Sequence, residues 1–253
     1  MRDYYVSKQR RLMQVFDFMF RPLKTKMATN YGEQYAQDIV IQSRLNFEEI
    51  IPQLPYVGGM KNYYTPILVV NGMIIAMYRA MAGTGKTAED VVRIWAEAAD
   101  DLFAKIPSWM AGLGGRALLS KPVVRGFNKQ TILSQERRYP EDWVYELLDG
   151  IGEEFDVGFE FSECAVIKLY QAMDTMELAP YCNFADVTYS HYLGIGLDAS
   201  ETLGMGCDRC RMLFKRGGET TITPNLVDIL PLAKKAAKST KEERPVNKHS
   251  RHY

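Results

Sequence analysis

Cys182 and Asp186 are the pair of residues in this chain that could most readily do chemistry together. They are four residues apart in the segment PYCNFAD, which begins with Pro180, so in a helix their side chains share one face. A thiol at the start of a helix has a lowered pKa, because the helix dipole stabilises the thiolate. The spacing therefore predicts a nucleophilic cysteine beside a carboxylate. A buried, inert cysteine next to a capping aspartate would give the same spacing.

Four cysteines occur in the chain, and all of them fall between positions 164 and 210. Four thiolates can bind a tetrahedral zinc ion, but such sites usually combine two C-x-x-C pairs. Cys207 and Cys210 form one such pair, whereas Cys164 and Cys182 do not form a second. The spacing therefore leaves two alternatives, a zinc site of unusual spacing or separate buried thiols.

The histidines limit the chemistry further. Of the three histidines, His249 and His252 lie in the basic segment over 232–253, so a Ser-His-Asp site would have to use His191. His191 lies in the segment YSHYLG, where a histidine with a purely structural role is the main alternative.

The elements that must position these residues lie in the C-terminal third. Phe155, Val157, Phe159 and Phe161 alternate with polar residues or glycine, which predicts a strand with one buried face. We expect helices over residues 164–173 and 181–193, the second ending at Gly194. Further strands are expected over residues 195–202 and 211–216.

The first part of the chain is predicted to be mainly helical. Apolar residues over 73–81 follow a helical pattern, Thr87 and Asp90 suggest a capping box, and the residues after Pro140 suggest a helix through Leu148. The predicted fold class is α+β, with a helical N-terminal layer packed on a small C-terminal sheet domain with a pocket. The expected organisation is a helical region over 1–150, an α+β domain with the cysteine motifs over 151–231, and a flexible basic tail over 232–253.

Composition and charge bear on partners and location. The 253 residues include 31 basic and 31 acidic side chains, and this balance gives no reason to expect nucleic acid or an anionic membrane as a partner. The most apolar stretch is interrupted by Asn71, Gly72 and Arg79, and no secretory signal is recognisable. We therefore expect a cytoplasmic protein with free thiols and no membrane partner, and the composition is compatible with a homo-oligomer.

Three segments with a characteristic order of cysteines carry a resemblance to a known family. FEFSEC over 159–164, APYCNFAD over 179–186 and GIGLDASETLGMGCDRCRMLFKRGG over 194–218 resemble the L-2-amino-thiazoline-4-carboxylic acid hydrolase family, and YPEDW over 139–143 resembles its Pro-x-x-Trp landmark. The resemblance covers roughly residues 135–217. Before residue 135 the chain shares with the family only its helical character. The recurrent residues of the family fall on Cys164, Cys182, Asp186, Thr202, Gly206 and Cys210. A more distant similarity connects the chain to 4-vinyl reductase-like ligand-binding domains.

The resemblance implies a hydrolase that opens a five-membered thiazoline or cyclic amidine at a C–S or C–N bond. In that reaction Cys182 would be the thiolate nucleophile, Asp186 would transfer protons, and Thr202 would orient the substrate. The expected substrate-binding residues are Cys164, Cys210, Arg209, Arg211 and His191, with one arginine holding a substrate carboxylate. The thiol mechanism needs no cofactor, whereas zinc-activated water would use Cys164, Cys182 and Cys210 as ligands.

Two features leave the substrate and the activity open. The family usually has an arginine before its first cysteine and Asp-Phe after its last, whereas this chain has Glu163 at the first place and Arg211 and Met212 at the second, and it adds Cys207. The alternative function is a sensor module of the 4-vinyl reductase-like type that binds a metal or an effector without turnover.

Overall fold

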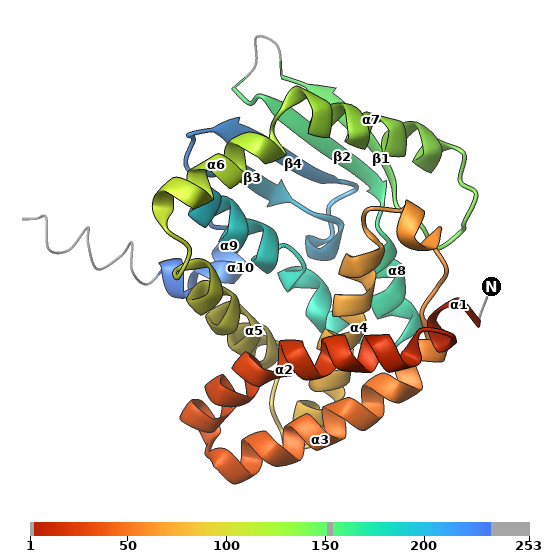
Figure 1. Ribbon diagram of the computed structural model, residues 1–253, viewed down its shortest axis with the longest axis vertical. Coiled ribbons are helices and arrows are strands. Elements are labelled where there is room, and N and C mark those ends of the chain that lie inside the picture. Colours follow the sequence, from red (N-terminus) through yellow and green to blue (C-terminus); the bar gives the residue numbers. More distant parts are fainter. Residues whose placement is uncertain (1–2, 151–153, 234–253) are drawn as a thin grey trace, which may run out of the picture.

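The computed structural model describes residues 3–150 and 154–233 and has the predicted α+β architecture. Helices fill the lower half of the view in Figure 1, and a four-stranded sheet lies in the upper half behind the helices α6 (Ser108–Leu118) and α7 (Lys121–Gln135). Buried side chains from the helices and from the sheet belong to a single hydrophobic cluster. The helical layer and the sheet therefore share one core.

Helices before the sheet build the lower half and the cover of the sheet. Their bounds are α1 (Asp3–Val6), α2 (Gln9–Tyr31), α3 (Glu33–Ile50), α4 (Thr65–Ala82), α5 (Ala88–Phe103), α6 (Ser108–Leu118) and α7 (Lys121–Gln135), with 3-10 turns η1 (Ile51–Gln53) and η2 (Gly59–Lys61). At the start of α5 the predicted capping box is present: Asp90 N–H donates to Thr87 Oγ1 at 3.3 Å and Thr87 N–H donates to Asp90 Oδ2 at 3.0 Å.

The sheet contains β1 (Val144–Asp149), β2 (Val157–Glu163), β3 (Ile195–Glu201) and β4 (Cys210–Arg216), in the order β1-β2-β4-β3 with antiparallel neighbours. Phe159 pairs with Met212, and Phe161 pairs with Cys210. Phe159, Phe161 and Cys210 are buried, so this set of alternating residues forms the inner face of the sheet. The intervening pair of Glu160 and Arg211 points to the outer face.

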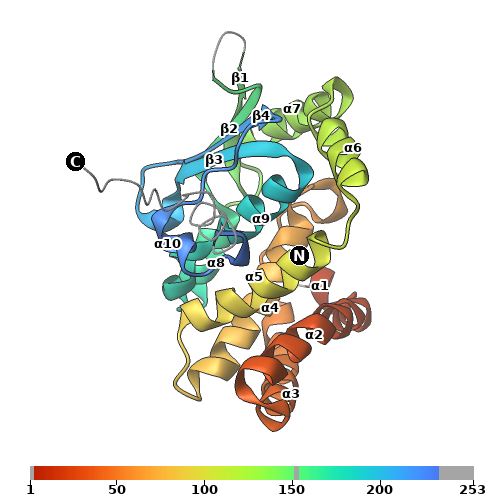
Figure 2. The ribbon, with the colours of Figure 1, turned by 90° about the vertical axis from the view of Figure 1, so that its left-hand side faces the viewer.

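Short elements between the strands and after β4 complete the C-terminal part. They are α8 (Ala165–Ala172), η3 (Met176–Tyr181), α9 (Phe184–Leu193), η4 (Leu203–Met205) and α10 (Pro224–Val227). α9 packs against β3, α5 and α6, and α7 packs against β1. In Figure 2, α6 and α7 follow one outer edge of the molecule, so together with α9 they enclose the inner face of the sheet.

Two predicted boundaries are wrong, for identifiable reasons. The helix expected after Pro140 is absent, because Val144 and Tyr145 pair with β2 and begin the strand β1. The helix expected from Tyr181 begins only at Phe184, because the chain around Pro180 forms the 3-10 turn η3. That helix ends as predicted, with Gly194 in the left-handed conformation at φ 63°.

The most apolar helix, α4, passes a length and composition test for a membrane span, but 67% of its apolar window is buried within the fold. It is therefore the central helix of the core. At the other end of the described chain, Leu232 and Ala233, which begin the predicted tail, are also buried. The remainder of the predicted basic tail lies outside the described residues.

Candidate active site

A cavity of about 110 Å³ lies between the inner face of the sheet and the helices α4, α8 and α9. Five residues singled out from the sequence line it together: Cys164, Cys182, Asp186, Thr202 and Cys210. The spacing of Cys182 and Asp186 predicted that these two would meet, and the structure brings them to the same cavity. The other three come from the ends of separate strands.

Local structure explains how the ends of the strands position these side chains at the cavity. Cys164 follows β2 and, with extended backbone angles, is the N-cap residue of α8. Thr202 follows β3 and caps η4, where its hydroxyl oxygen accepts the Met205 N–H at 3.2 Å. Cys210 starts β4, and its sulfur accepts the Leu203 N–H at 3.1 Å. Each candidate is therefore fixed by a backbone feature as well as by packing.

The turn at Gly204 requires a glycine because of its close packing. A Cβ atom at this position would lie 2.1 Å from the carbonyl oxygen of Ala179 and 3.0 Å from the Sγ atom of Cys182. The absence of a side chain allows η4 to approach Cys182, and this approach brings Thr202 within hydrogen-bonding reach of the thiol.

Burial dominates the electrostatics of Cys182. It raises the pKa of the thiol well above its usual value, and the neighbouring Cys164, Cys210 and Asp186 raise the pKa further, whereas the hydrogen bond from Thr202 lowers it. The predicted lowering of this pKa by the dipole of a helix is wrong. Cys182 precedes the N-cap residue Asn183 and lies outside the first turn of α9.

Asp186 is the acid of the cavity, and its side chain is half-buried. Burial raises the pKa of its carboxyl group to about 6, although the side-chain hydrogen bond with Tyr189 lowers it. A carboxyl group that titrates close to neutral pH can both accept and return a proton, which is the property of a general acid-base catalyst. Burial also raises the pKa of Tyr189 well above its usual value, so this hydroxyl group stays protonated.

Cys164 and Cys210, like Cys182, have thiols whose pKa burial raises, so these thiols are protonated at neutral pH. Burial raises the pKa of Cys164, although the backbone amides of Ile167 and Val166 and the side chain of Trp143 favour its thiolate. Burial raises the pKa of Cys210 to about 12. A nucleophilic thiolate in this cavity therefore needs a proton acceptor or a bound cation, and Asp186 is the acceptor that the cavity provides.

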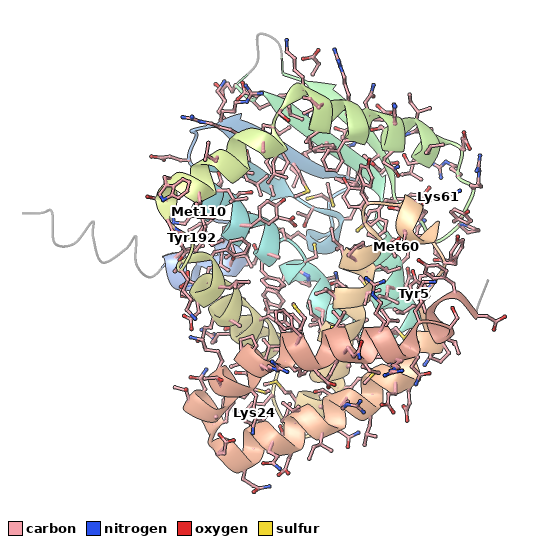
Figure 3. The ribbon with its side chains drawn as sticks, viewed as in Figure 1. Tyr5, Lys24, Met60, Lys61, Met110 and Tyr192 are labelled. Atoms are coloured by element: carbon pink, nitrogen blue, oxygen red, sulfur yellow. The ribbon has the colours of Figure 1, made fainter. Side chains whose placement is uncertain are left out.

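Four candidates lie outside the cavity. His191 is exposed on α9, with its ring against Tyr192, whose hydroxyl group donates to Asp100 Oδ1 of α5 at 2.7 Å. Figure 3 places the labelled Tyr192 at the outer side of α9 near α5. Arg209 and Arg211 both form ion pairs with Glu160 on the outer face of the sheet. Cys207 is half-buried in the turn before β4. The predicted substrate contacts of His191, Arg209 and Arg211 therefore have no counterpart in this cavity.

The thiols are free and do not form a metal-binding group. No disulfide joins the four cysteines, all of which lie in the described part of the chain. Within residues 3–150 and 154–233, no three His, Cys, Asp or Glu side chains are grouped so that they could hold a metal ion. Cys164, Cys182 and Cys210 share the cavity without the close approach that a zinc site needs.

Sequence reasoning missed several residues that complete the cavity. Asn71 is a polar residue of the apolar helix α4, and its Oδ1 atom accepts the hydroxyl group of Tyr170 at 2.5 Å. Trp143 lines this cavity and also a surface hollow of about 420 Å³, to which Met60 and Lys61, labelled in Figure 3, contribute. The signal for Asn71 was its isolation among apolar residues, and Trp143 was part of the Pro-x-x-Trp landmark.

A comparison with known families decides where the chain belongs. The sequence profile described as L-2-amino-thiazoline-4-carboxylic acid hydrolase matches residues 68–214, which is more than half of the chain. The chain belongs to the L-2-amino-thiazoline-4-carboxylic acid hydrolase family. No curated protein and no solved structure gives a significant match.

Membership of the L-2-amino-thiazoline-4-carboxylic acid hydrolase family supports a hydrolase-like function in general. The matched range begins in α4 and includes α5, α6 and α7. The resemblance therefore extends well before residue 135, where the sequence motifs had placed its start. It also includes Asn71, which belongs to the cavity wall.

Proposed function

We propose that the protein is a hydrolase that opens a five-membered thiazoline or cyclic amidine ring, with Cys182 as the nucleophile and Asp186 as the proton-transfer group. The observation that carries the proposal is the convergence of three thiols, a carboxyl group that titrates near neutral pH and a threonine on one cavity. The family membership supports the reaction class. We further propose a small-molecule substrate and a cytoplasmic location, where thiols stay reduced.

In the proposed first step, Asp186 takes the proton of the Cys182 thiol, and the Sγ atom adds to the ring carbon that bears the amidine nitrogens. The tetrahedral intermediate then collapses with cleavage of the bond between this carbon and the ring sulfur. Asp186 returns its proton to the departing sulfur, which leaves as a thiol. The amidine carbon is now attached to Cys182.

In the proposed second step, Asp186 takes a proton from a water molecule, and the water oxygen adds to the same carbon. Collapse of this intermediate breaks the bond to Cys182 and moves the hydroxyl proton to the ring-derived nitrogen, which releases a urea group. Asp186 returns its proton to the Cys182 sulfur, so one water molecule is consumed per ring opened. Thr202 supports both steps by donating its hydroxyl hydrogen bond to the Cys182 thiolate, because its own position is fixed by the cap of η4.

The decisive experiment combines turnover with alkylation and metal analysis of the full chain. Release of a thiol from 2-amino-2-thiazolines, lost after iodoacetamide treatment of metal-free protein, would support the thiol mechanism. Stoichiometric zinc with activity that depends on it would favour metal-activated water instead. Tight ligand binding without any turnover of thiazolines or cyclic amidines would favour the alternative of a non-catalytic sensor module.

A further inference from the structure

A second cavity, named the apolar cavity, has a volume of about 160 Å³. It adjoins the cysteine cavity, which is the cavity lined by Cys164, Cys182 and Cys210, on the side of α6 and α7. Five residues line both cavities: Tyr64, Ile67, Phe161, Asp186 and Met212. The remaining wall of the second cavity is almost entirely apolar and comes from α6, α7 and the inner face of the sheet, with Leu118, Leu119, Val124, Phe127, Phe159 and Phe214 among its residues. The proposed reaction does not use this space.

In the described part of the chain, the ionisable side chains that line the two cavities include an acid but no basic group. Asp186 is an acid at their junction, and among the described residues no Lys, Arg or His side chain lines either cavity. Arg209 and Arg211 are held by Glu160 on the outer face of the sheet. Lys168, which interacts electrostatically with Cys164, binds Glu163 and donates to the carbonyl oxygen of Asp142 at 3.1 Å.

This charge distribution discriminates between ligands. A ligand carboxylate in the cavities would be desolvated beside Asp186 without a cationic partner, which is strongly unfavourable. A cationic amidinium ring would instead pair with Asp186, and its positive charge would favour the thiolate form of Cys182. The apolar cavity would accept a branched or aromatic hydrocarbon group next to that ring.

We propose that the substrate is a cationic cyclic amidine or isothiourea that carries an apolar substituent where the substrate named in the family description carries a carboxylate. This inference rests on the proposed function for the ring, and on the two cavities for the substituent. The ring lies in the cysteine cavity with its amidinium group at Asp186. The substituent lies in the apolar cavity against α6 and α7.

The test of the substituent uses three 2-amino-2-thiazolines, with hydrogen, a carboxylate or an isobutyl group at ring carbon 4, and measures Kd by calorimetry and kcat/KM by thiol release. Each buried carbon of the substituent is expected to tighten binding about fourfold. The isobutyl compound, with four such carbons, should therefore bind up to roughly 250-fold more tightly than the unsubstituted ring, and the carboxylate compound should bind most weakly. Equal or tighter binding of the carboxylate compound would overturn the inference.

Val124 and Val123 provide a matched pair for locating the substituent. Both are partly buried neighbours in α7, but only Val124 lines the apolar cavity. Val124→Phe should lower the ratio of Kd values between the unsubstituted and the isobutyl compound at least tenfold, without changing the Kd of the unsubstituted ring. Val123→Phe should leave both Kd values unchanged. Val124→Ala, which enlarges the cavity, should shift the preference toward a larger substituent. Identical behaviour of all three variants would place the substituent elsewhere.

The proposed pairing of the cationic ring with Asp186 has its own test. The neutral ring thiazolidin-2-one should bind more weakly than the aminothiazoline ring, and Asp186→Asn should remove most of this difference. An undiminished preference for the cationic ring in Asp186→Asn would refute the assigned charge pairing.

The proposed function and the ligand inference can fail separately. If the apolar compound binds as expected but no compound is turned over, the proposed function fails while the ligand class stands. If rings are turned over with a preference for the carboxylate, the proposed function stands and the inference fails.

Discussion

Asp186 and Tyr189 are joined by a side-chain hydrogen bond one turn apart in α9, at the junction of the two cavities. Tyr189 lines only the apolar cavity, whereas Asp186 lines both. The hydrogen bond favours the ionised form of Asp186 while burial opposes it, and the balance leaves the pKa at about 6. The carboxyl group is thus held next to Cys182 in a state that responds to small changes of pH or ligand charge.

Asp186→Asn should affect activity and its pH dependence together. Because the ionised carboxylate is the proton acceptor, kcat/KM of the wild type should rise with pH through about 6, and the variant should lose most of its activity together with this rise. The measurement is a pH profile of thiol release. A variant with the wild-type profile would exclude Asp186 as the proton-transfer group.

The same substitution should stabilise the folded protein above pH 6. The folded-state pKa of Asp186 lies above the ordinary value of 3.8, so its contribution to stability falls as the pH rises through the interval from about 4 to about 6. A neutral asparagine side chain at this position carries no such penalty, which amounts to roughly 3 kcal/mol for a shift of about two pH units. Denaturant unfolding at pH 4 and pH 7.5 should show a gain for Asp186→Asn only at the higher pH. A gain of equal size at both pH values would contradict this explanation.

Cys182→Ser and Cys207→Ser should differ by orders of magnitude in turnover. Cys182 lines the cavity beside Asp186, whereas Cys207 lies in the turn before β4 and lines neither cavity. A serine hydroxyl is far less nucleophilic than a thiolate at neutral pH, so Cys182→Ser should be nearly inactive and Cys207→Ser should stay within a few-fold of the wild type. Similar small losses in both variants would argue against covalent catalysis.

The amount of structure that could be predicted differed between elements. The alternation of Phe159 and Phe161, the capping box at Thr87 and the stop at Gly194 are local signals, and each had the predicted outcome. The start of β1 was missed, because the proline and acids before Val144 favour a helix locally while pairing with β2 decides the outcome. Tertiary pairing of this kind cannot be read from one segment.

The candidate site shows the same division between local and tertiary information. The motif positions of Cys164, Cys182 and Thr202 predicted residues that do share one cavity. The sequence could not predict that Arg211 would face away from it, since this depends on the register of β4 against β2. Nor could it predict the pKa of Cys182, because burial outweighs the position of the residue near a helix start.

Thr202→Val and Thr202→Ser should separate the hydroxyl group from the methyl group of this residue. Thr202 caps η4 and forms a hydrogen bond with Cys182 that favours the thiolate. Loss of the hydroxyl group in Thr202→Val should slow iodoacetamide alkylation of Cys182 several-fold and lower kcat/KM at least tenfold. Thr202→Ser retains the hydroxyl group, so it should restore both rates to near the wild-type values. Slow turnover in Thr202→Val with an unchanged alkylation rate would assign Thr202 to the substrate instead.

Arg209→Gln and Arg211→Gln should change neither turnover nor the preference among the three thiazolines. Both arginines are about half exposed and paired with Glu160 on the outer face of the sheet, so they cannot hold a ligand in the cysteine cavity without a reversal of the β4 face. Exposed ion pairs contribute little to stability, and each substitution should cost less than about 1 kcal/mol. The measurement is KM for the carboxylate compound in both variants, with Arg138→Gln as a control in an exposed ion pair elsewhere. KM should rise tenfold or more only if a substrate carboxylate reaches the outer face of the sheet. Such a rise, for the carboxylate compound alone and in one of these two variants alone, would contradict the assignment of the cysteine cavity as the ring-binding site.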